Sequence, residues 1–274
     1  MILTEENYFS ESADMKYFGS SQYKAFSKCE EKALAELQGR YIRQDTTALL
    51  VGSYVDAHFS GNLDLFRAKH PEIFKRDGDL KAEYKKAEDI IYRIERDKLF
   101  SMLLSGDTQA IRIGEISGVP VKIKMDSYLT GKRCEKIVDT FPETAEVFGF
   151  CEGAIVDLKI VKDFEAIYDP SVGCRIPWIQ YWGYDTQGAI YQHIEGHQLP
   201  YIIAAATKEP ETNLGLFHIS QDVLDTRMVE IEEMIPHYED VKRGRVAPDR
   251  CGDCDWCRRT KELKSIIEYE EVAV

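Results

Sequence analysis

The first third of the chain has apolar residues at helical spacing. Helices are predicted at 20–38 and 46–60, and a more charged, largely helical segment is predicted at 64–104. On the second of these helices His58 lies one turn beyond Tyr54, so the two side chains share a face. A histidine at such a position is more often a core or surface residue than a ligand, so its spacing alone assigns it no chemistry.

The middle of the chain has the spacing of strands. Apolar and polar residues alternate on both sides of Ser117-Gly118, which predicts a β-hairpin whose second strand ends near Asp126. A short strand is expected at 136–140. The almost unbroken aliphatic run at 153–161 predicts a buried strand, around which the remaining elements are organised.

Two charges interrupt this buried strand. Because side chains alternate between the faces of a strand, Asp157 and Lys159 point to the same side, about 6 to 7 Å apart along the strand. A carboxylate and an ammonium in an apolar strand are costly unless they are paired, hydrogen-bonded or bound to a metal. These two residues alone leave a structural ion pair and a reactive pair equally open.

The last third returns to a mixed pattern. It predicts a helix, two strands and a helix, at 176–195, 201–207, 216–219 and 223–242. On the first of these helices Gln187 and Tyr191 are four residues apart and share a face, for which core packing is the ordinary explanation.

This order of elements predicts an α/β fold with a central mixed sheet flanked by helices. A chain of 274 residues can bury a large core as one domain, so a single domain over 1–274 is expected. Within it we distinguish an N-terminal helical part (20–105), a core (106–220) and a C-terminal helix with a Cys-rich tail (221–274).

Charge and composition narrow the function. A formal net charge of -13 argues against a protein that simply coats nucleic acid, but allows an enzyme that concentrates positive charge locally. The basic span 242–259 is one such concentration, with a solvated surface as its alternative explanation. Because the chain has neither a long apolar run nor the features of a secretory signal, no membrane partner and a cytoplasmic location are expected.

The cysteines predict a metal site. Cys251, Cys254 and Cys257 are separated by two-residue gaps in a turn-like context and can converge on one metal ion or cluster. A fourth ligand is needed, and Cys29 is the natural candidate, although a lone cysteine on a helix is usually a small core residue. The other three cysteines have no mutual spacing and are interpreted as structural.

Together and in this order, the segments resemble the PD-(D/E)XK nuclease superfamily, specifically its RecE-like and RecB-like exonuclease branch, often encoded by phages and prophages. The segment 52–58 resembles the helix that supplies a metal-binding histidine, and Asp126 resembles the first acidic residue. The segments 156–159 and 187–191 resemble the D-x-K signature and the Q-x-x-x-Y helix. The resemblance covers about 20–210, and order plus spacing make it more specific than its parts.

The resemblance implies a restriction-endonuclease-like core with a site for Mg²⁺ or Mn²⁺. The implied ligands are an imidazole, two carboxylates and a backbone oxygen, from His58, Asp126, Asp157 and Leu158. Lys159 would orient or activate the attacking water, and Gln187 and Tyr191 would hold the strand end or a flanking phosphate. Asp139 also ends an apolar stretch and is an alternative to Asp126.

The cysteines have a parallel in the same superfamily. Some helicase-linked (AddB-type) and CRISPR-adaptation nucleases bind a [4Fe-4S] cluster through one cysteine before the core and three after it. Cys29 with Cys251, Cys254 and Cys257 would do the same here. The last gap is shorter than in those proteins, so zinc stays open as the bound metal.

The resulting expectation is a Mg²⁺-dependent DNA exonuclease of recombination or repair that acts on linear double-stranded or single-stranded ends and leaves 5′-phosphate products. By analogy, a single-strand annealing recombinase is a candidate partner and a homo-oligomer a candidate assembly. Two alternatives stay open: a structure-specific or single-strand endonuclease with the same site, and a non-catalytic metal-clasped adaptor. Trp178, Tyr181 and Trp182 are candidates for stacking on unpaired bases, with core packing as the more ordinary role.

Overall fold

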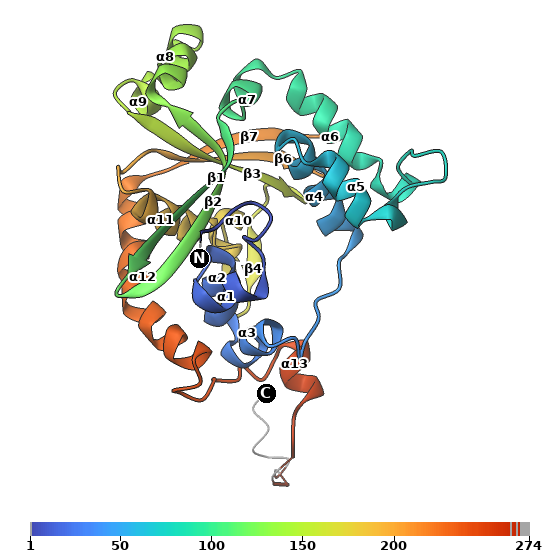
Figure 1. Cartoon of the computed structure of the whole chain (residues 1–274), viewed down its shortest axis with the longest axis vertical. Helices are drawn as coiled ribbons and strands as arrows, with labels where there is room; N and C mark the ends of the chain where they lie inside the picture. Colours follow the sequence, from blue (N-terminus) through green and yellow to red (C-terminus); the bar gives the residue numbers. More distant parts are fainter. Residues whose placement is uncertain (1, 264, 267, 269–274) are drawn as a thin grey trace.

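A mixed five-stranded sheet forms the centre of the computed structural model, which describes residues 2–263, 265, 266 and 268 (Figure 1). Its strands lie in the order β1-β2-β3-β6-β7, with bounds Asp107–Ile116, Val119–Thr130, Gly153–Val161, Tyr201–Thr207 and Leu214–Ile219. Strands β3 and β6 are parallel, and the other neighbours are antiparallel. A separate two-stranded sheet pairs β4 (Ile167–Asp169) with β5 (Cys174–Ile176).

Helices precede and surround this sheet. Those before it are α1 (Glu11–Lys16), α2 (Ser20–Lys28), α3 (Glu30–Leu37), α4 (Thr47–Phe59), α5 (Leu63–Lys69), the 3-10 turns η1 (Pro71–Ile73) and η2 (Ala82–Tyr84), α6 (Lys86–Glu95) and α7 (Lys98–Leu103). Those after the hairpin are α8 (Gly131–Thr140), η3 (Pro142–Thr144), α9 (Ala145–Phe148), α10 (Trp178–Tyr181), α11 (Tyr184–Glu195), α12 (Gln221–Lys242) and α13 (Asp255–Arg259). No described helix is long and apolar enough to cross a bilayer.

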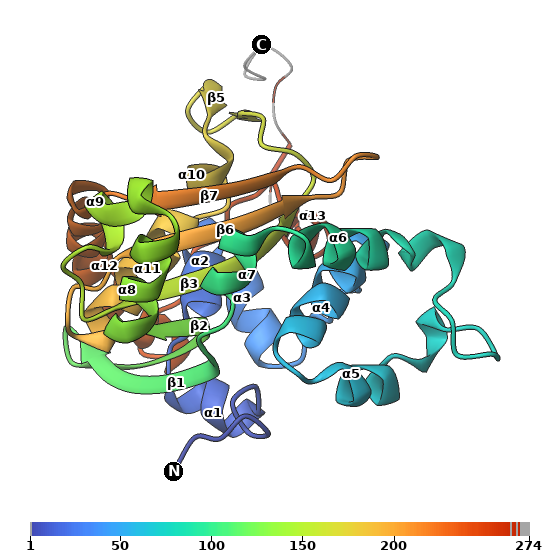
Figure 2. The ribbon, with the colours of Figure 1, turned by 90° about the horizontal axis from the view of Figure 1, so that it is seen from above.

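The two faces of the sheet are covered by different helices (Figure 2). Helices α2, α3, α11 and α12 pack on one face, where Ile155 of β3 is buried. Helices α4, α6, α7 and α8 pack on the other face, where the next residue, Val156, is buried. Because β3 is covered on both sides, nearly every residue along it is apolar. The predicted α/β fold with a central mixed sheet flanked by helices is confirmed.

Local sequence signals explain several of these elements. Ser117 and Gly118 both have positive φ, 47° and 77°, as a tight hairpin turn requires. The Thr46 side chain accepts a hydrogen bond from the Leu49 amide at 3.2 Å and so begins α4. Gly188 allows α11 to approach β6 closely, since a Cβ there would lie 2.6 Å from the ring of Tyr201.

One predicted strand and two predicted helices were wrong. The segment 136–140 belongs to helix α8, where Cys134 and Ile137 are buried at helical spacing, so the apolar period is three to four rather than two. The predicted helix 20–38 is two helices, because Cys29 has an extended backbone with φ -168° and ψ 107°. Gly183, with φ 62°, likewise divides the predicted helix 176–195 into α10 and α11.

Candidate active site and cysteine cluster

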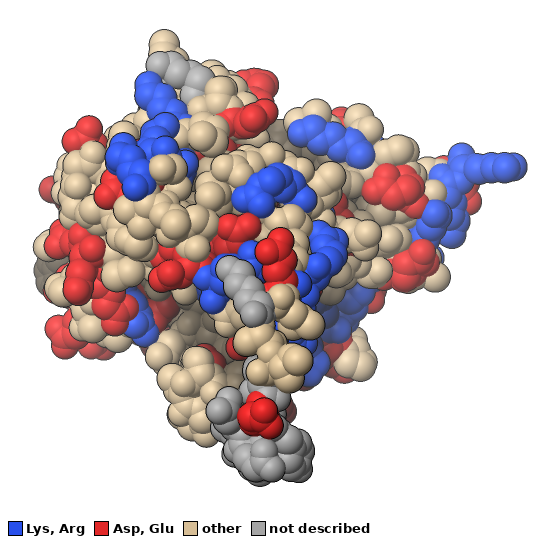
Figure 3. Space-filling model, turned by 90° about the horizontal axis from the view of Figure 1, so that it is seen from below, with Lys and Arg blue, Asp and Glu red and all other residues tan. Residues whose placement is uncertain are grey.

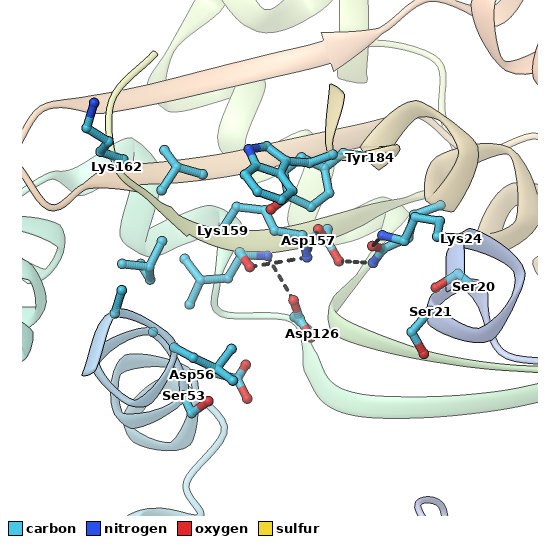
Figure 4. Close-up of a pocket in the computed structure, with 18 of the residues that line it drawn as sticks. Ser20, Ser21, Lys24, Ser53, Asp56, Asp126, Asp157, Lys159, Lys162 and Tyr184 are labelled. Atoms are coloured by element: carbon cyan, nitrogen blue, oxygen red, sulfur yellow. Dashed lines mark hydrogen bonds and ion pairs between the residues drawn. The ribbon is translucent and has the colours of Figure 1, made fainter. Parts of the chain in front are cut away.

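A cavity of about 1190 Å³ opens beside the sheet between α2 and α4. Figure 4 shows its charged lining, to which α4 contributes Asp56, β2 contributes Asp126, and β3 contributes Asp157 and Lys159. Lys24 reaches the same cavity from α2. Segments widely separated in the sequence therefore converge on one charged site.

Asp157 and Lys159 form an ion pair at the bottom of this cavity. The Asp157 side chain is only 2% exposed. Its Oδ1 accepts a hydrogen bond of 2.6 Å from Gln187 Nε2, while its Oδ2 faces the Lys159 ammonium. Burial by itself would lower the pKa of Lys159, but Asp157 and Asp126 outweigh it and raise that pKa, so the ammonium stays charged.

Gln187 extends this arrangement to a second lysine. Its Oε1 accepts a hydrogen bond of 3.1 Å from Lys24 Nζ, so Lys24 holds the amide whose other end holds Asp157. Burial, together with the neighbouring Lys159, lowers the pKa of Lys24 to about 8. Lys24 carries no sequence motif, and only the docking of α2 against α11 identifies it.

Asp126 lies beside the pair on the adjacent strand. Its Oδ2 accepts a hydrogen bond of 2.9 Å from the Leu158 amide, which joins β2 to β3 at the site. Burial raises the pKa of Asp126 well above its ordinary value, and the charges of Asp157 and Asp56 raise it further. The alternative Asp139 lies on helix α8 and is not part of the cavity lining.

The structure does not bring His58 to this cavity. Its Nε2 lies 2.9 Å from Glu95 Oε1, and Asp56 from the same helix lines the cavity instead. Two residues apart on a helix means about 200° apart around its axis, so one helix cannot point both side chains at one site. A signal for Asp56 was present in the sequence, because Leu49, Ser53 and Asp56 recur at helical spacing on one side of α4.

The remaining predicted residues have backbone contacts. Tyr191 is buried, and its hydroxyl donates a hydrogen bond of 3.0 Å to the carbonyl of Lys124 on β2. The Leu158 carbonyl accepts a long hydrogen bond of 3.5 Å from Lys159 Nζ. Gln187 and Tyr191 thus face the sheet together, and each contacts a different strand of the site.

The four predicted cysteines meet at the C-terminal end of α2. Cys29 Sγ lies 3.5 Å from Cys257 Sγ and 3.8 Å from Cys254 Sγ, and Cys251 Sγ lies 3.9 Å from Cys257 Sγ. Among the described residues these are the one set whose His, Cys, Asp or Glu ligand atoms all lie within 4.8 Å of one another. The break between α2 and α3 is what places Cys29 in this set.

The sulfur atoms lie close enough together to hold a metal. Four sulfurs held 2.3 Å from a central zinc in a tetrahedron lie about 3.8 Å apart, close to the distances found here. A four-iron cluster places metal and sulfide atoms between its thiolates and therefore needs a wider set. Neighbouring contacts hold the tail in place, since Asp255 pairs with Lys32 at 2.6 Å and Trp256 Nε1 donates to Glu31 at 3.2 Å.

Comparisons with known proteins find matches that cover nearly the whole chain. Residues 19–139 and 150–260 match the model of a family described as "PDDEXK-like domain of unknown function (DUF3799)". A crystal structure of a protein from Eubacterium rectale, described as a candidate exonuclease, is similar with a TM-score of 0.84 and 41% sequence identity over 98% of this chain and 97% of that one. A search of curated proteins found no match.

The crowding of carboxylates generates a prediction about stability. A carboxyl whose pKa is raised by folding destabilises the protein at neutral pH, and this cost disappears below about pH 4, where the unfolded chain also binds the proton. We expect Asp126→Asn to raise the free energy of unfolding by about 1 kcal/mol at pH 7 in chelator. The amide oxygen can still accept the Leu158 hydrogen bond.

The matched control is Asp157→Asn, which removes the partner of buried Lys159 and should give no gain. Urea titrations at pH 7 and pH 4 measure both variants. A loss of stability for Asp126→Asn at pH 7, or an equal gain for Asp157→Asn, would contradict the conclusion that the charged Asp126 carboxylate destabilises the folded protein.

Proposed function

The chain belongs to the family of PDDEXK-like domains, within the PD-(D/E)XK nuclease superfamily, and from that premise we propose that it hydrolyses DNA at the cavity of Asp126, Asp157 and Lys159. The observation that carries the proposal is the convergence of acidic residues with one charged lysine in a cavity that opens to solvent. This site gives a nuclease what it needs: ligands for a cation and a positive group for the phosphate.

The donor chemistry of the site fits a hard divalent ion. Asp56, Asp126 and Asp157 offer only oxygen atoms, which Mg²⁺ and Mn²⁺ prefer, and burial with mutual repulsion raises the pKa of both Asp56 and Asp126. A cation would relieve that repulsion. When bound, it supplies charge stabilisation for the phosphoryl oxygens and a more acidic water. We assign Asp56 the ligand position expected of His58, with the Leu158 carbonyl as a further oxygen.

The other residues would act around this ion. Lys159 keeps its proton and can donate hydrogen bonds to the scissile phosphate or to the attacking water. Gln187 holds one oxygen of Asp157 and so fixes the orientation of the carboxylate, whose other oxygen faces the Lys159 ammonium. Tyr191 is a positioning residue, because its hydroxyl fixes the backbone of β2 at Lys124, two residues before Asp126.

We further propose exonuclease action on linear DNA, in the manner of the RecE-like and RecB-like branch, with 5′-phosphate products and a role in recombination or repair. The similarity to the Eubacterium rectale protein supports exonuclease action, and the chemistry of the superfamily supports products with a 5′-phosphate. A recombinase partner and a homo-oligomer follow by analogy with this branch. The endonuclease alternative uses the same site, whereas the complete Asp157, Lys159 and Gln187 set argues against a non-catalytic adaptor.

A comparison of substrates tests the exonuclease assignment. With Mg²⁺, we expect linear DNA to be degraded progressively from its ends, while a covalently closed circle of the same sequence stays intact, because an exonuclease needs a free end. Gel analysis of both forms over time measures this. Cleavage of the circle would establish the endonuclease alternative, and hydrolysis of neither form with Mg²⁺ or Mn²⁺ would favour the adaptor.

Variants of the site test the residues. We expect Asp157→Asn and Lys159→Gln each to lower the rate of DNA hydrolysis at least 100-fold, because each removes a group needed for transition-state charge. Asp56→Asn should lower the rate of DNA hydrolysis to a similar extent. The rate of His58→Gln should stay within about threefold of the parent, since that imidazole pairs with Glu95. Circular dichroism and thermal unfolding check that each variant folds. Full activity of Asp157→Asn, or loss of activity in His58→Gln, would refute the site.

We also propose that the four cysteines hold a single zinc ion that fastens the tail to the α2–α3 junction. The sulfur spacing supports zinc over the [4Fe-4S] cluster. The ion would close a loop of more than 200 residues between Cys29 and Cys251, so its contribution is expected to be structural.

Metal analysis tests this assignment. Purified protein should contain one zinc per chain and lack the brown colour and absorption near 400 nm of an iron–sulfur protein. Cys251→Ser should reduce bound zinc and lower the melting temperature, whereas Cys174→Ser, an exposed cysteine outside the cluster, should change neither. Stoichiometric iron and sulfide after anaerobic purification would reject zinc.

A further inference from the structure

Aromatic and cationic side chains also line the cavity, and they come from other elements than Asp56, Asp126 and Asp157. Tyr168 on β4, Arg175 on β5, Trp182 after α10 and Arg43 on the loop before α4 all line it. Tyr168 is 57% exposed and Trp182 is 46% exposed. Such large exposed rings beside cations at a cavity mouth are not needed for the hydrolysis step.

Trp182 differs from its neighbour Trp178 in its surroundings. Trp178 is 5% exposed and packs against Phe164, with ring centroids 5.6 Å apart and nearly parallel rings. It therefore belongs to the core and anchors α10. Trp182 contacts Tyr181 edge to face at 5.0 Å, and Lys28 Nζ lies 5.4 Å from its ring centroid. Tyr181 thus holds the ring at its edge and Lys28 lies over one of its faces, while part of its surface stays open to solvent.

Two cations beside these rings, Lys28 and Arg43, lie near each other. Burial lowers the pKa of Lys28, and the charge of Arg43 lowers it further. Tyr168 and Arg175 are directly opposite each other in the β4-β5 pair, so this small sheet adds one ring and one charge to the rim. Three cations and two exposed rings can contact a short length of an anionic, aromatic ligand.

The charge of the whole molecule limits what that ligand is. A duplex is bound chiefly through many phosphate contacts, which need a broad basic surface. The chain has net charge -13, and Figure 3 shows Lys and Arg in separate groups among Asp and Glu on the face drawn there. Asp157 is buried in the lining of the cavity, and a single strand can bring a phosphate to such a position more easily than a duplex can.

From these observations we propose that Trp182, Tyr168 and Lys28 form an entry site that binds unpaired nucleotides of a single DNA strand by stacking and leads that strand to the cavity. The inference rests on the proposed nuclease function and deepens it by naming the form of DNA at the mouth. Base stacking on aromatic rings tolerates any sequence, which suits a strand that must pass through. The cations neutralise the phosphates between stacked bases.

Tryptophan fluorescence tests the entry site directly. The chain has three tryptophans, and Trp178 and Trp256 are buried at 5% and 8% exposure, so quenching by a ligand at the mouth should come from Trp182. The experiment uses the full chain carrying Asp157→Asn, without divalent ions, so that a dT12 oligonucleotide binds uncut. We expect dT12 to quench the emission, and a blunt duplex of equal length to bind at least tenfold more weakly.

Variants in the same background identify the residues. Trp182→Ala should abolish most of the quenching, and an anisotropy assay with labelled dT12 should show affinity lowered about tenfold, as expected for the loss of one stacked base. The matched control is Tyr92→Ala. Tyr92 lies on α6, is exposed and is not part of the cavity lining, and Arg96 lies 5.2 Å from the centroid of its ring. The Tyr92→Ala variant should bind dT12 as tightly as the chain that carries Asp157→Asn alone.

Three results would overturn the entry site: equal dT12 affinity for Trp182→Ala and parent, an equal loss for Tyr92→Ala, or a duplex that binds as tightly as dT12. These results are separable from failure of the nuclease assignment. Hydrolysis is scored on the chain with Asp157 intact, so an active enzyme whose Trp182→Ala variant binds dT12 normally would refute the entry site and leave the nuclease function standing.

Discussion

The site depends on one buried carboxylate in the central strand. Asp157 is almost fully buried, and its charge is tolerated because Gln187 donates to one oxygen and Lys159 faces the other. Placing Gln187 there requires α11 to lie close against β6, which Gly188 permits. Thus the packing of one helix on the sheet determines whether a charge inside the core is stable.

The same carboxylate sets the character of the cavity around it. Asp126 and Asp56 are buried near Asp157, and burial, together with the charge of Asp157, raises their pKa values. A fold selected for stability alone would avoid this arrangement. The lower stability of the unoccupied site is offset where a divalent ion binds these carboxylates.

The middle and the C-terminal end of α2 connect this chemistry to the rest of the molecule. Lys24 in its middle contacts Gln187, while its last residue, Lys28, lies over Trp182. Immediately after it, Cys29 breaks the helix and meets the cysteines of the tail. A metal clasp at this point would therefore fix the position of α2, and through α2 both the buried network and the mouth of the cavity.

The sequence alone determined the elements that depend on local spacing. Alternation predicted the hairpin and the buried strand and put Asp157 and Lys159 on one face, and the cysteine spacing indicated the metal set. Tertiary structure decided what depends on how elements dock. It selected Asp56 over His58 on α4, added Lys24, and turned the chain at Cys29. Periodicity shows which residues share a face, but only packing determines where that face points.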